Sequence, residues 1–185
     1  MPVVLYDANV LYPSTLRDVL IRIGIARLAT PRWTNQILDE VFRNLTANRP
    51  DLDPQRLSRT RTLMNRAIHD VLVTGYEHRI GDLVLPDPGD RHVLAAAIES
   101  GAQVNVTKNL KDFPVGALEP HGIAARHPDT FLRELHGTKP DVLTEVFRKI
   151  AAAWPPGSTV SDVLKSLDVE APTTVAAVQA AEPHV

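Results

Sequence analysis

Acidic and polar side chains follow two short apolar stretches of this sequence, and they are the residues best suited to chemistry. Asp7 and Asn9 come directly after the apolar residues 3–6. A second polar group follows residues 104–106, in which Asn105 lies between two valines, and consists of Thr107, Asn109 and Asp112. Both stretches are typical of short strands buried in a parallel sheet. Because ligands bind beyond the carboxyl ends of such strands, we expect each strand to deliver an acid to the same edge of the sheet.

A third source of carboxylates is the loop that precedes the second of these strands. Asp87 and Asp90 come before a helix predicted over Val93–Ile98, which Gly101 ends. Asp90 has two interpretations, because an acid before a helix can cap its N-terminus or bind a ligand, and one carboxylate can do both. Asp87 lies in a Pro-Asp-Pro-Gly sequence, which favours a turn residue over a site residue.

Glu40 belongs to a helix predicted from Thr34, whose apolar stripe comprises Ile37, Leu38, Val41, Phe42 and Leu45. Glu40 lies outside this stripe, and Asn44 follows one turn later on the same side of the helix. That position suits a glutamate exposed to solvent as well as a glutamate in a site. Periodicity alone leaves both interpretations open.

Several carboxylates at one sheet edge would form a site made only of oxygen ligands. The chain has no cysteine, which excludes disulfides, thiolate metal sites and thiol nucleophiles, and no histidine lies at ligand spacing from these acids. Oxygen ligands suit Mg²⁺ or Mn²⁺, whereas neighbouring carboxylates without a cation repel one another. These cations suggest phosphate esters as substrates, because two ions roughly 3.5–4 Å apart can activate a water and stabilise the leaving oxygen.

The order of the predicted elements indicates an α/β fold. After the first strand come helices that begin near Ser14, Thr34 and Asp53, and extended segments are predicted around Arg32, at 83–85, at 104–106 and at 122–126. The helix from Asp53 is predicted to continue to about Thr74, and another helix begins at Pro128. Long helical connections between strands favour a mainly parallel sheet with helices on both faces, which is a three-layer α/β/α arrangement.

The character of the chain changes beyond Gly137. An amphipathic segment at 141–154, a break at Pro155-Pro156-Gly157 and a further helix at 159–167 are predicted, followed by an alanine-rich stretch at 172–181. We therefore divide the 185 residues into one main domain at 1–137 and a helical C-terminal extension at 138–185. We expect the extension to cap the domain, to pack on a partner or to fray.

Charge and hydropathy narrow the class of protein. The chain has 20 basic and 22 acidic residues and a formal net charge of −2, so bulk charge indicates neither a nucleic-acid binder nor a membrane binder. Positive charge gathers locally on the third helix, either as a solvated face or as an RNA contact patch, at Arg56, Arg59, Arg61 and Arg66. No apolar run approaches the roughly 20 residues that a bilayer requires, and we expect the first residues to form a strand rather than a secretory signal. We expect a soluble, cytoplasmic protein.

Four motifs resemble, in their order and spacing, those of the PIN-domain nucleases. They are Asp7-Ala8-Asn9 after the first strand, Glu40 in the following helical region, DPGDRHVLA at 87–95 and TKNLKDFP at 107–114. Gly122-Ile123 and the sequence PDTFL at 128–132 are similar to the last strand and closing helix of the family. The resemblance spans roughly residues 2–135. This family includes the ribonuclease toxins of VapBC toxin–antitoxin pairs.

The resemblance implies a metal-dependent nuclease whose Mg²⁺ or Mn²⁺ ions are held by Asp7, Glu40, Asp90 and Asp112. Glu40 would bind through water, and Asn109 competes with Asp112 because members of the family carry either residue type in this loop. Asn9, Thr107 and Asn109 would orient carboxylates or water by hydrogen bonds. The chain departs from the family in two respects, the polar Asn105 in a strand that is usually apolar and the long tail after Gly137.

Three functions follow from these observations. The resemblance implies an endoribonuclease that leaves 5′-phosphate and 3′-hydroxyl ends by water attack, a homodimeric toxin held inactive by a cognate antitoxin. The second is a PIN fold without catalysis that serves as an RNA-binding or protein-interaction module. The third is a metal-dependent phosphatase of the haloacid-dehalogenase type, suggested by Asp7 after the first strand. That family requires a second aspartate two residues later, where this chain has Asn9.

Overall fold

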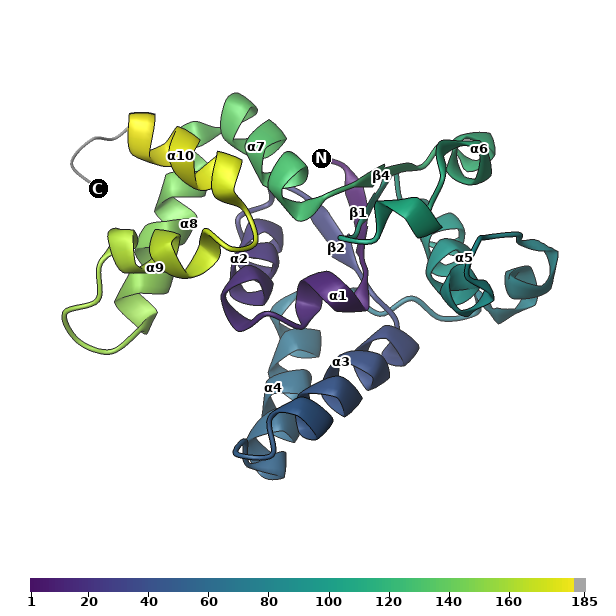
Figure 1. Cartoon of the computed structure of the whole chain (residues 1–185), viewed down its shortest axis with the longest axis horizontal. Coiled ribbons are helices and arrows are strands. Elements are labelled where there is room, and N and C mark those ends of the chain that lie inside the picture. The colour runs from purple at the N-terminus through teal and green to yellow at the C-terminus, as the bar shows by residue number, and fades with distance from the viewer. Residues whose placement is uncertain (182–185) are drawn as a thin grey trace.

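The computed structural model describes residues 1–181 as a four-stranded parallel sheet surrounded by helices (Figure 1). The strands lie in the order β2-β1-β3-β4 and comprise β1 (Val3–Tyr6), β2 (Thr30–Arg32), β3 (Val104–Val106) and β4 (Ala124–Arg126). The α-helices are α1 (Ala8–Leu11), α2 (Ser14–Ile25), α3 (Asn35–Asn48), α4 (Pro54–Ala67), α5 (Arg91–Glu99), α6 (Val115–Leu118), α7 (Pro128–Thr138), α8 (Pro140–Ala153), α9 (Val160–Leu167) and α10 (Pro172–Ala181). The predicted α/β class and the parallel sheet are confirmed.

The strand β1 occupies the middle of the sheet because its side chains are apolar on both faces. Val4, Leu5 and Tyr6 are fully buried, as expected for a parallel strand that is covered on both sides. β1 pairs with β2 along one edge and with β3 along the other. The backbone N–H of Asp7 donates to the carbonyl of Val106 at 3.1 Å. The residues that follow β1 and β3 therefore lie side by side at one edge of the sheet.

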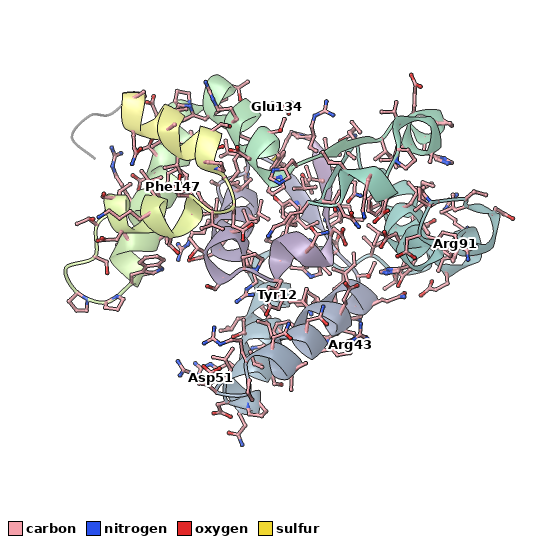
Figure 2. All side chains as sticks on the ribbon, viewed as in Figure 1. Tyr12, Arg43, Asp51, Arg91, Glu134 and Phe147 are labelled. Atoms are coloured by element: carbon pink, nitrogen blue, oxygen red, sulfur yellow. The ribbon has the colours of Figure 1, made fainter. Side chains whose placement is uncertain are left out.

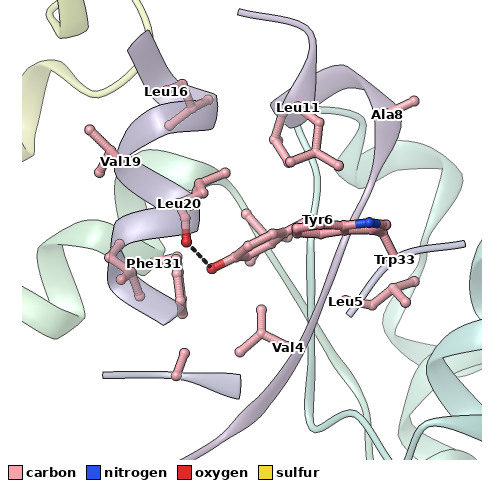
Figure 3. Packing of buried hydrophobic residues seen from close by; sticks show 14 of the residues in the cluster. Val4, Leu5, Tyr6, Ala8, Leu11, Leu16, Val19, Leu20, Trp33 and Phe131 are labelled. Carbon is pink, nitrogen blue, oxygen red and sulfur yellow. Dashed lines mark hydrogen bonds between the residues drawn. The ribbon is translucent and has the colours of Figure 1, made fainter. Parts of the chain in front are cut away.

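Helices cover both faces of the sheet and complete the predicted three layers. α2 and α7 pack on one face and α5 on the other (Figure 1). Tyr6 joins the sheet to the first of these layers (Figure 3). Its ring stacks on Trp33 with centroids 6.5 Å apart and meets Phe131 edge-on at 6.3 Å, and its hydroxyl donates to the carbonyl of Leu20 at 3.3 Å. Aromatic pairs of this kind add about 0.5–1.5 kcal/mol to the free energy gained by burial.

The helices α3 and α4 form a pair that projects from the body at the bottom of Figure 1. The prediction that the second of them continues to about residue 74 was wrong, because α4 ends at Ala67 and Ile68 has an extended backbone. The next apolar residues run beside Trp33, whose backbone pairs with both Val71 and Val73. Their apolar character therefore reflects burial of an extended segment rather than a helical stripe.

The predicted strand at 83–85 was also wrong. This segment joins no sheet in the described residues, and Leu83 and Leu85 instead bury their side chains as anchors of an irregular loop. Short apolar runs are ambiguous in this way, because burial alone does not supply a strand partner. No helix within residues 1–181 is long and apolar enough to cross a membrane.

The C-terminal helices α8, α9 and α10 pack against α2 and α7 rather than standing apart from the sheet (Figure 1). Leu143, Phe147 and Leu164 are fully buried in the same apolar cluster as the strands. Asp129 at the start of α7 accepts hydrogen bonds from the backbone of Thr174 at 2.9 Å and from its hydroxyl at 2.8 Å. The predicted division at residue 137 thus falls in the last turn of α7, which packs against α8, and residues 182–185 of the predicted extension lie outside the described residues.

Candidate metal centre and substrate groove

Asp7 lies at the carboxyl end of β1 and is 6% exposed. Its Oδ1 accepts the backbone N–H of Ala8 at 2.7 Å, and its Oδ2 accepts the Asn9 amide at 2.8 Å and the Thr107 hydroxyl at 2.7 Å. Burial raises the pKa of Asp7, and these hydrogen bonds oppose that rise because they stabilise the carboxylate. The structure thus places both side chains predicted to orient this carboxylate, Asn9 and Thr107, in direct contact with it.

The loop after β3 is fixed by the same network. The Asn9 side chain accepts the backbone N–H of Lys108 at 2.9 Å, and the Thr107 hydroxyl accepts the backbone N–H of Asn109 at 3.0 Å. The Asn9 amide also donates to the Thr107 hydroxyl at 3.0 Å. The two strand ends are therefore joined by side-chain hydrogen bonds, which stiffens the edge of the sheet where the acids gather.

Asp90 occupies the N-cap position of α5 without acting as its cap. Its side chain makes no capping hydrogen bond, and its Oδ2 is buried with no hydrogen-bond partner in the described residues. Asp87 carries out the turn predicted for it, since its Oδ1 accepts the backbone N–H of Gly89 at 2.7 Å. A carboxylate oxygen that is buried and unpartnered is costly, so the capping interpretation does not account for Asp90.

The electrostatic surroundings of Asp90 show which other acids lie near it. Burial and the negative charges of Asp7, Asp87, Asp112 and Glu40 together raise the pKa of Asp90 to about 6, and burial contributes most. All four predicted carboxylates therefore gather in one electrostatic neighbourhood. Like charges held together in this way favour protonation or the binding of a cation.

Glu40 is half-buried on α3 and faces this neighbourhood rather than open solvent. Burial raises the pKa of Glu40, the charge of Asp7 raises it further, and Arg43 opposes both effects. Glu40 lines the same hollow as Asn9, together with Asn44 one turn further along the helix. Periodicity left open whether Glu40 is exposed to solvent or lies in a site. In the structure Glu40 faces the other acids.

Asp112 and Asn109 were alternatives for one place in the site, and the structure brings them together. The amide of Asn109 forms a short hydrogen bond with Oδ2 of Asp112 in the loop that follows β3. The charge of Asp112 also contributes to the raised pKa of Asp90. Asn109 therefore orients the carboxylate of Asp112, which agrees with the orienting role predicted for the amide.

A hollow of about 310 Å³ opens beside the acids, and its lining includes three residues that the sequence did not single out, namely Tyr12, Asn48 and Lys108. Its polar lining consists of Asn9, Tyr12, Glu40, Asn44, Asn48 and Lys108. Tyr12 lies at the junction between α1 and the α3–α4 pair (Figure 2). Tyr12 follows Asp7 by five residues in the sequence, so it is close to a predicted site residue along the chain. The contact between α1 and α3 is what brings it to this surface.

The three arginines predicted as RNA contacts have different surroundings. Arg61 forms an ion pair with Asp39 at 2.6 Å and donates to the carbonyl of Asn35 at 3.2 Å, so it holds α4 to α3. Arg56 lines a second hollow of about 480 Å³. Arg59 is exposed on α4 and lines neither hollow. Arg61 lines two other hollows, whereas the hollow of Arg56 shares Tyr12 with the hollow beside the acids.

The donor set fits a hard divalent cation that keeps part of its water shell. Within residues 1–181, no three acidic or histidine side chains converge closely enough to form a complete metal-binding cluster. Mg²⁺ commonly binds through one or two carboxylates and retains several waters, so it does not need such a cluster. The unpartnered oxygen of Asp90, the oriented carboxylate of Asp7 and the shared excess of negative charge supply what this cation requires.

Comparison with known proteins agrees with this arrangement. A family model described as "PIN domain" matches residues 3–111, which is more than half of the chain. The chain belongs to the PIN-domain family. The segment that matches this family contains Asp7, Glu40 and Asp90 and ends one residue before Asp112.

One curated relative can be named, although the similarity is confined to a short stretch. Over 43 residues the chain is 63% identical to "Putative ribonuclease VapC50" of Mycobacterium tuberculosis (strain ATCC 25618 / H37Rv). This stretch covers 23% of the chain and 25% of that protein, so the alignment spans a quarter of the relative's length. No solved structure matched the chain.

Proposed function

We propose that this PIN-domain protein is a metal-dependent endoribonuclease that hydrolyses RNA phosphodiester bonds. The observation that carries the proposal is the buried, unpartnered oxygen of Asp90 in the electrostatic field of Asp7, Glu40 and Asp112. Such an arrangement is expensive for a folded protein unless a cation completes it. Family membership and the relative named a ribonuclease support the same reaction class.

In this proposal Asp7, Glu40, Asp90 and Asp112 would hold the cation, with Glu40 binding through water. Mg²⁺ or Mn²⁺ would activate a water for attack on phosphorus and offset the charge of the phosphodiester. Neighbouring side chains of the protein would orient the carboxylates that hold the cation. Thr107 and Asn9 hold the Asp7 carboxylate in one orientation, and Asn109 does the same for Asp112. Residues in this supporting role commonly affect metal affinity or activity by about 10- to 100-fold.

The biological role that we propose is that of a toxin in a toxin–antitoxin system. The support for it is the similarity to a protein whose name includes VapC, over a quarter of that protein's length. The proposed partners are RNA as the substrate, a cognate antitoxin as the inhibitor and a second copy of the chain in a homodimer.

Two other functions are less well supported. A PIN fold without catalysis would have no reason to keep a buried acid without a partner beside three other acids. A phosphatase of the haloacid-dehalogenase type needs an acid-base group two residues after Asp7, and here Asn9 uses its amide to orient Asp7 and Thr107. An amide cannot exchange a proton in that role.

Cleavage of a mixed RNA substrate tests the proposed activity. Wild-type protein should cut the RNA with Mg²⁺ or Mn²⁺ and not with EDTA, and Asp7→Asn should remove this cutting while its circular dichroism stays that of the wild type. Cutting that persists in Asp7→Asn or in EDTA would indicate a contaminating ribonuclease. Absence of cutting by the wild type, with RNA and Mn²⁺ both tested for binding, would favour the module without catalysis.

A further inference from the structure

Two hollows on the surface meet at Tyr12. The first contains Glu40, Asn44 and Asn48 along one side of α3, and the second lies between α2, α3 and α4. Tyr12 lines both of them. The two hollows therefore adjoin at Tyr12, and together we call them the groove. Asp51 lies at the tip of the α3–α4 pair (Figure 2).

We infer that this groove binds single-stranded RNA on one side of the scissile phosphate, with a base stacked on Tyr12 and a phosphate held by Arg56. The inference rests on the proposed nuclease function and extends it to the class and path of the substrate. Three independent features of the groove carry it, namely the surroundings of Tyr12, the balance of charge in the second hollow and the polar lining of the first.

Tyr12 is an aromatic residue that the fold leaves partly accessible at this surface. Tyr6, Trp33 and Phe131 are buried in the core, whereas the ring of Tyr12 lines two hollows. Its backbone is held in place, because Arg17 donates to its carbonyl at 3.0 Å. A rigid, accessible ring suits stacking with an unpaired base, which is the usual way that proteins bind single-stranded RNA.

The second hollow carries positive charge without a carboxylate among its lining residues. Arg17 is committed to backbone carbonyls, and Arg49 is paired with Asp51 at 2.8 Å. Arg56 is exposed and has no ion pair among residues 1–181. A guanidinium group that has no ion pair and lines the same hollow as an aromatic ring is suited to a phosphate.

The first hollow is lined by side-chain amides between Tyr12 and the acids. Asn44 and Asn48 are exposed on the same side of α3 as Glu40, and the Asn48 amide lies 3.4 Å from the Tyr12 hydroxyl. Amides offer both donors and acceptors, which match the edges of an unpaired base. An acidic peptide would pair with Arg56, but its carboxylates would not match an aromatic ring flanked by amides. RNA is therefore the occupant that the groove favours.

Binding of a fluorescent 12-nucleotide RNA of random sequence tests the inference without requiring cleavage. Anisotropy would be measured with Ca²⁺ present, and the RNA would be checked on a gel to remain intact. Tyr12→Ala should weaken binding by about 5- to 150-fold because a stacked base is lost, whereas Tyr12→Phe, which keeps the ring, should bind as the wild type does. A duplex of the same sequences should bind more weakly than the single strands.

Arg56→Ala should weaken binding and lower the slope of log K against log salt by about 0.7, the value for one phosphate contact on a single strand. Arg66→Ala is the matched control, because it removes the same charge from the other end of α4 and lies outside both hollows. Thermal melts would show that each variant is folded.

Unchanged RNA binding in Tyr12→Ala, or equal losses in Arg56→Ala and Arg66→Ala, would overturn the inference and leave the groove to another occupant such as an acidic segment of a partner protein. The same holds if the wild type does not bind single-stranded RNA at all. Failure of the nuclease proposal is recognised separately, by absence of metal-dependent cutting while RNA binding still depends on Tyr12.

Discussion

Glu170, in the segment between α9 and α10, forms an ion pair with Lys108 in the loop after β3. Lys108 directly follows Thr107, and its backbone N–H donates to the Asn9 side chain. The pair is partly shielded, with side-chain exposures of 33% for Lys108 and 17% for Glu170. The C-terminal helices are thus tied to the edge of the sheet that carries the acids, in addition to covering α2 and α7.

Removal of this ion pair should cost stability. Glu170→Ala leaves the Lys108 ammonium partly buried without its partner, and we expect the free energy of unfolding to fall by about 1 kcal/mol. Lys165→Ala is the matched control, because its contact with Asp162 is exposed and 3.9 Å long, and it should change stability by less than about 0.5 kcal/mol. Urea denaturation measures the change in the free energy of unfolding for both variants. Equal changes would show that the ion pair between Lys108 and Glu170 stabilises the protein no more than an exposed contact does.

The carboxylate of Asp129 should stabilise the protein at neutral pH, and this effect should disappear in acid. Burial would raise the pKa of Asp129, but hydrogen bonds from Thr174 and Thr173 outweigh burial and lower the pKa. A carboxyl group whose pKa is lower in the folded state than in the unfolded state stabilises the protein at pH values above the unfolded pKa of about 3.9. This stabilisation is lost as the pH falls through the folded-state pKa. Asp129→Asn should therefore destabilise by about 1–2 kcal/mol at pH 7, and its difference from the wild type should shrink at pH 3.

Asp70→Asn serves as the control for this experiment. Asp70 is exposed and has a left-handed backbone with φ of 55°, which asparagine also adopts readily. Urea denaturation at both values of pH should show little difference between this variant and the wild type. A difference for Asp129→Asn that stays constant with pH would contradict a role for its charge.

The buried amide of Asn105 should lower the stability of the protein. Asn105 is 1% exposed in β3, and both polar atoms of its amide lack hydrogen-bond partners in the described residues. Asn105→Val should stabilise the protein by about 1–3 kcal/mol, because unsatisfied polar groups are removed and a β-branched residue suits a buried strand. Thr34→Val is the contrasting change, since the Thr34 hydroxyl caps α3 at 3.0 Å, and it should destabilise by about 1 kcal/mol. Destabilisation by Asn105→Val would show that the amide has a partner.

The raised pKa of Asp90 predicts opposite effects of pH on metal affinity and on the metal-free protein. Because the pKa of Asp90 is raised to about 6, the contribution of Asp90 to the stability of the metal-free protein should be greatest below the unfolded value of about 3.9 and should be lost as pH rises through 6. Mn²⁺ needs the ionised carboxylate, so its affinity should increase over the same range. Calorimetric titration with Mn²⁺ at pH 5 and pH 7.5 measures this, and equal affinities would exclude Asp90 as a ligand.

The sequence was sufficient to predict the sheet edge and the acids that follow its strands. The apolar residues 3–6 and 104–106 lead directly to Asp7 and Thr107, and parallel pairing of these strands brings the two side chains within 2.7 Å. The choice between a cap and a ligand for Asp90 required the structure, because both interpretations place an acid before a helix. The absence of a capping bond favours the ligand.

Other features depended on contacts between distant segments that periodicity does not encode. The end of α4 is decided by pairing of residues 71–73 with Trp33, and Glu40 faces the acids because of how α3 packs on α1. Arg61 has the same residue type as Arg56 and lies five positions away, yet it is held by Asp39. Tyr12 and Lys108 became visible as site residues only when the hollow beside the acids was known.

The most direct test of the account compares Asp90→Asn with Asp87→Asn in the rate of RNA cleavage with saturating Mg²⁺. Both changes remove one negative charge from the same loop, and asparagine at residue 87 can still accept the hydrogen bond from Gly89. The account predicts a loss of at least about 100-fold for Asp90→Asn and a rate close to that of the wild type for Asp87→Asn. Equal rates for the two variants would contradict a metal centre built on Asp90.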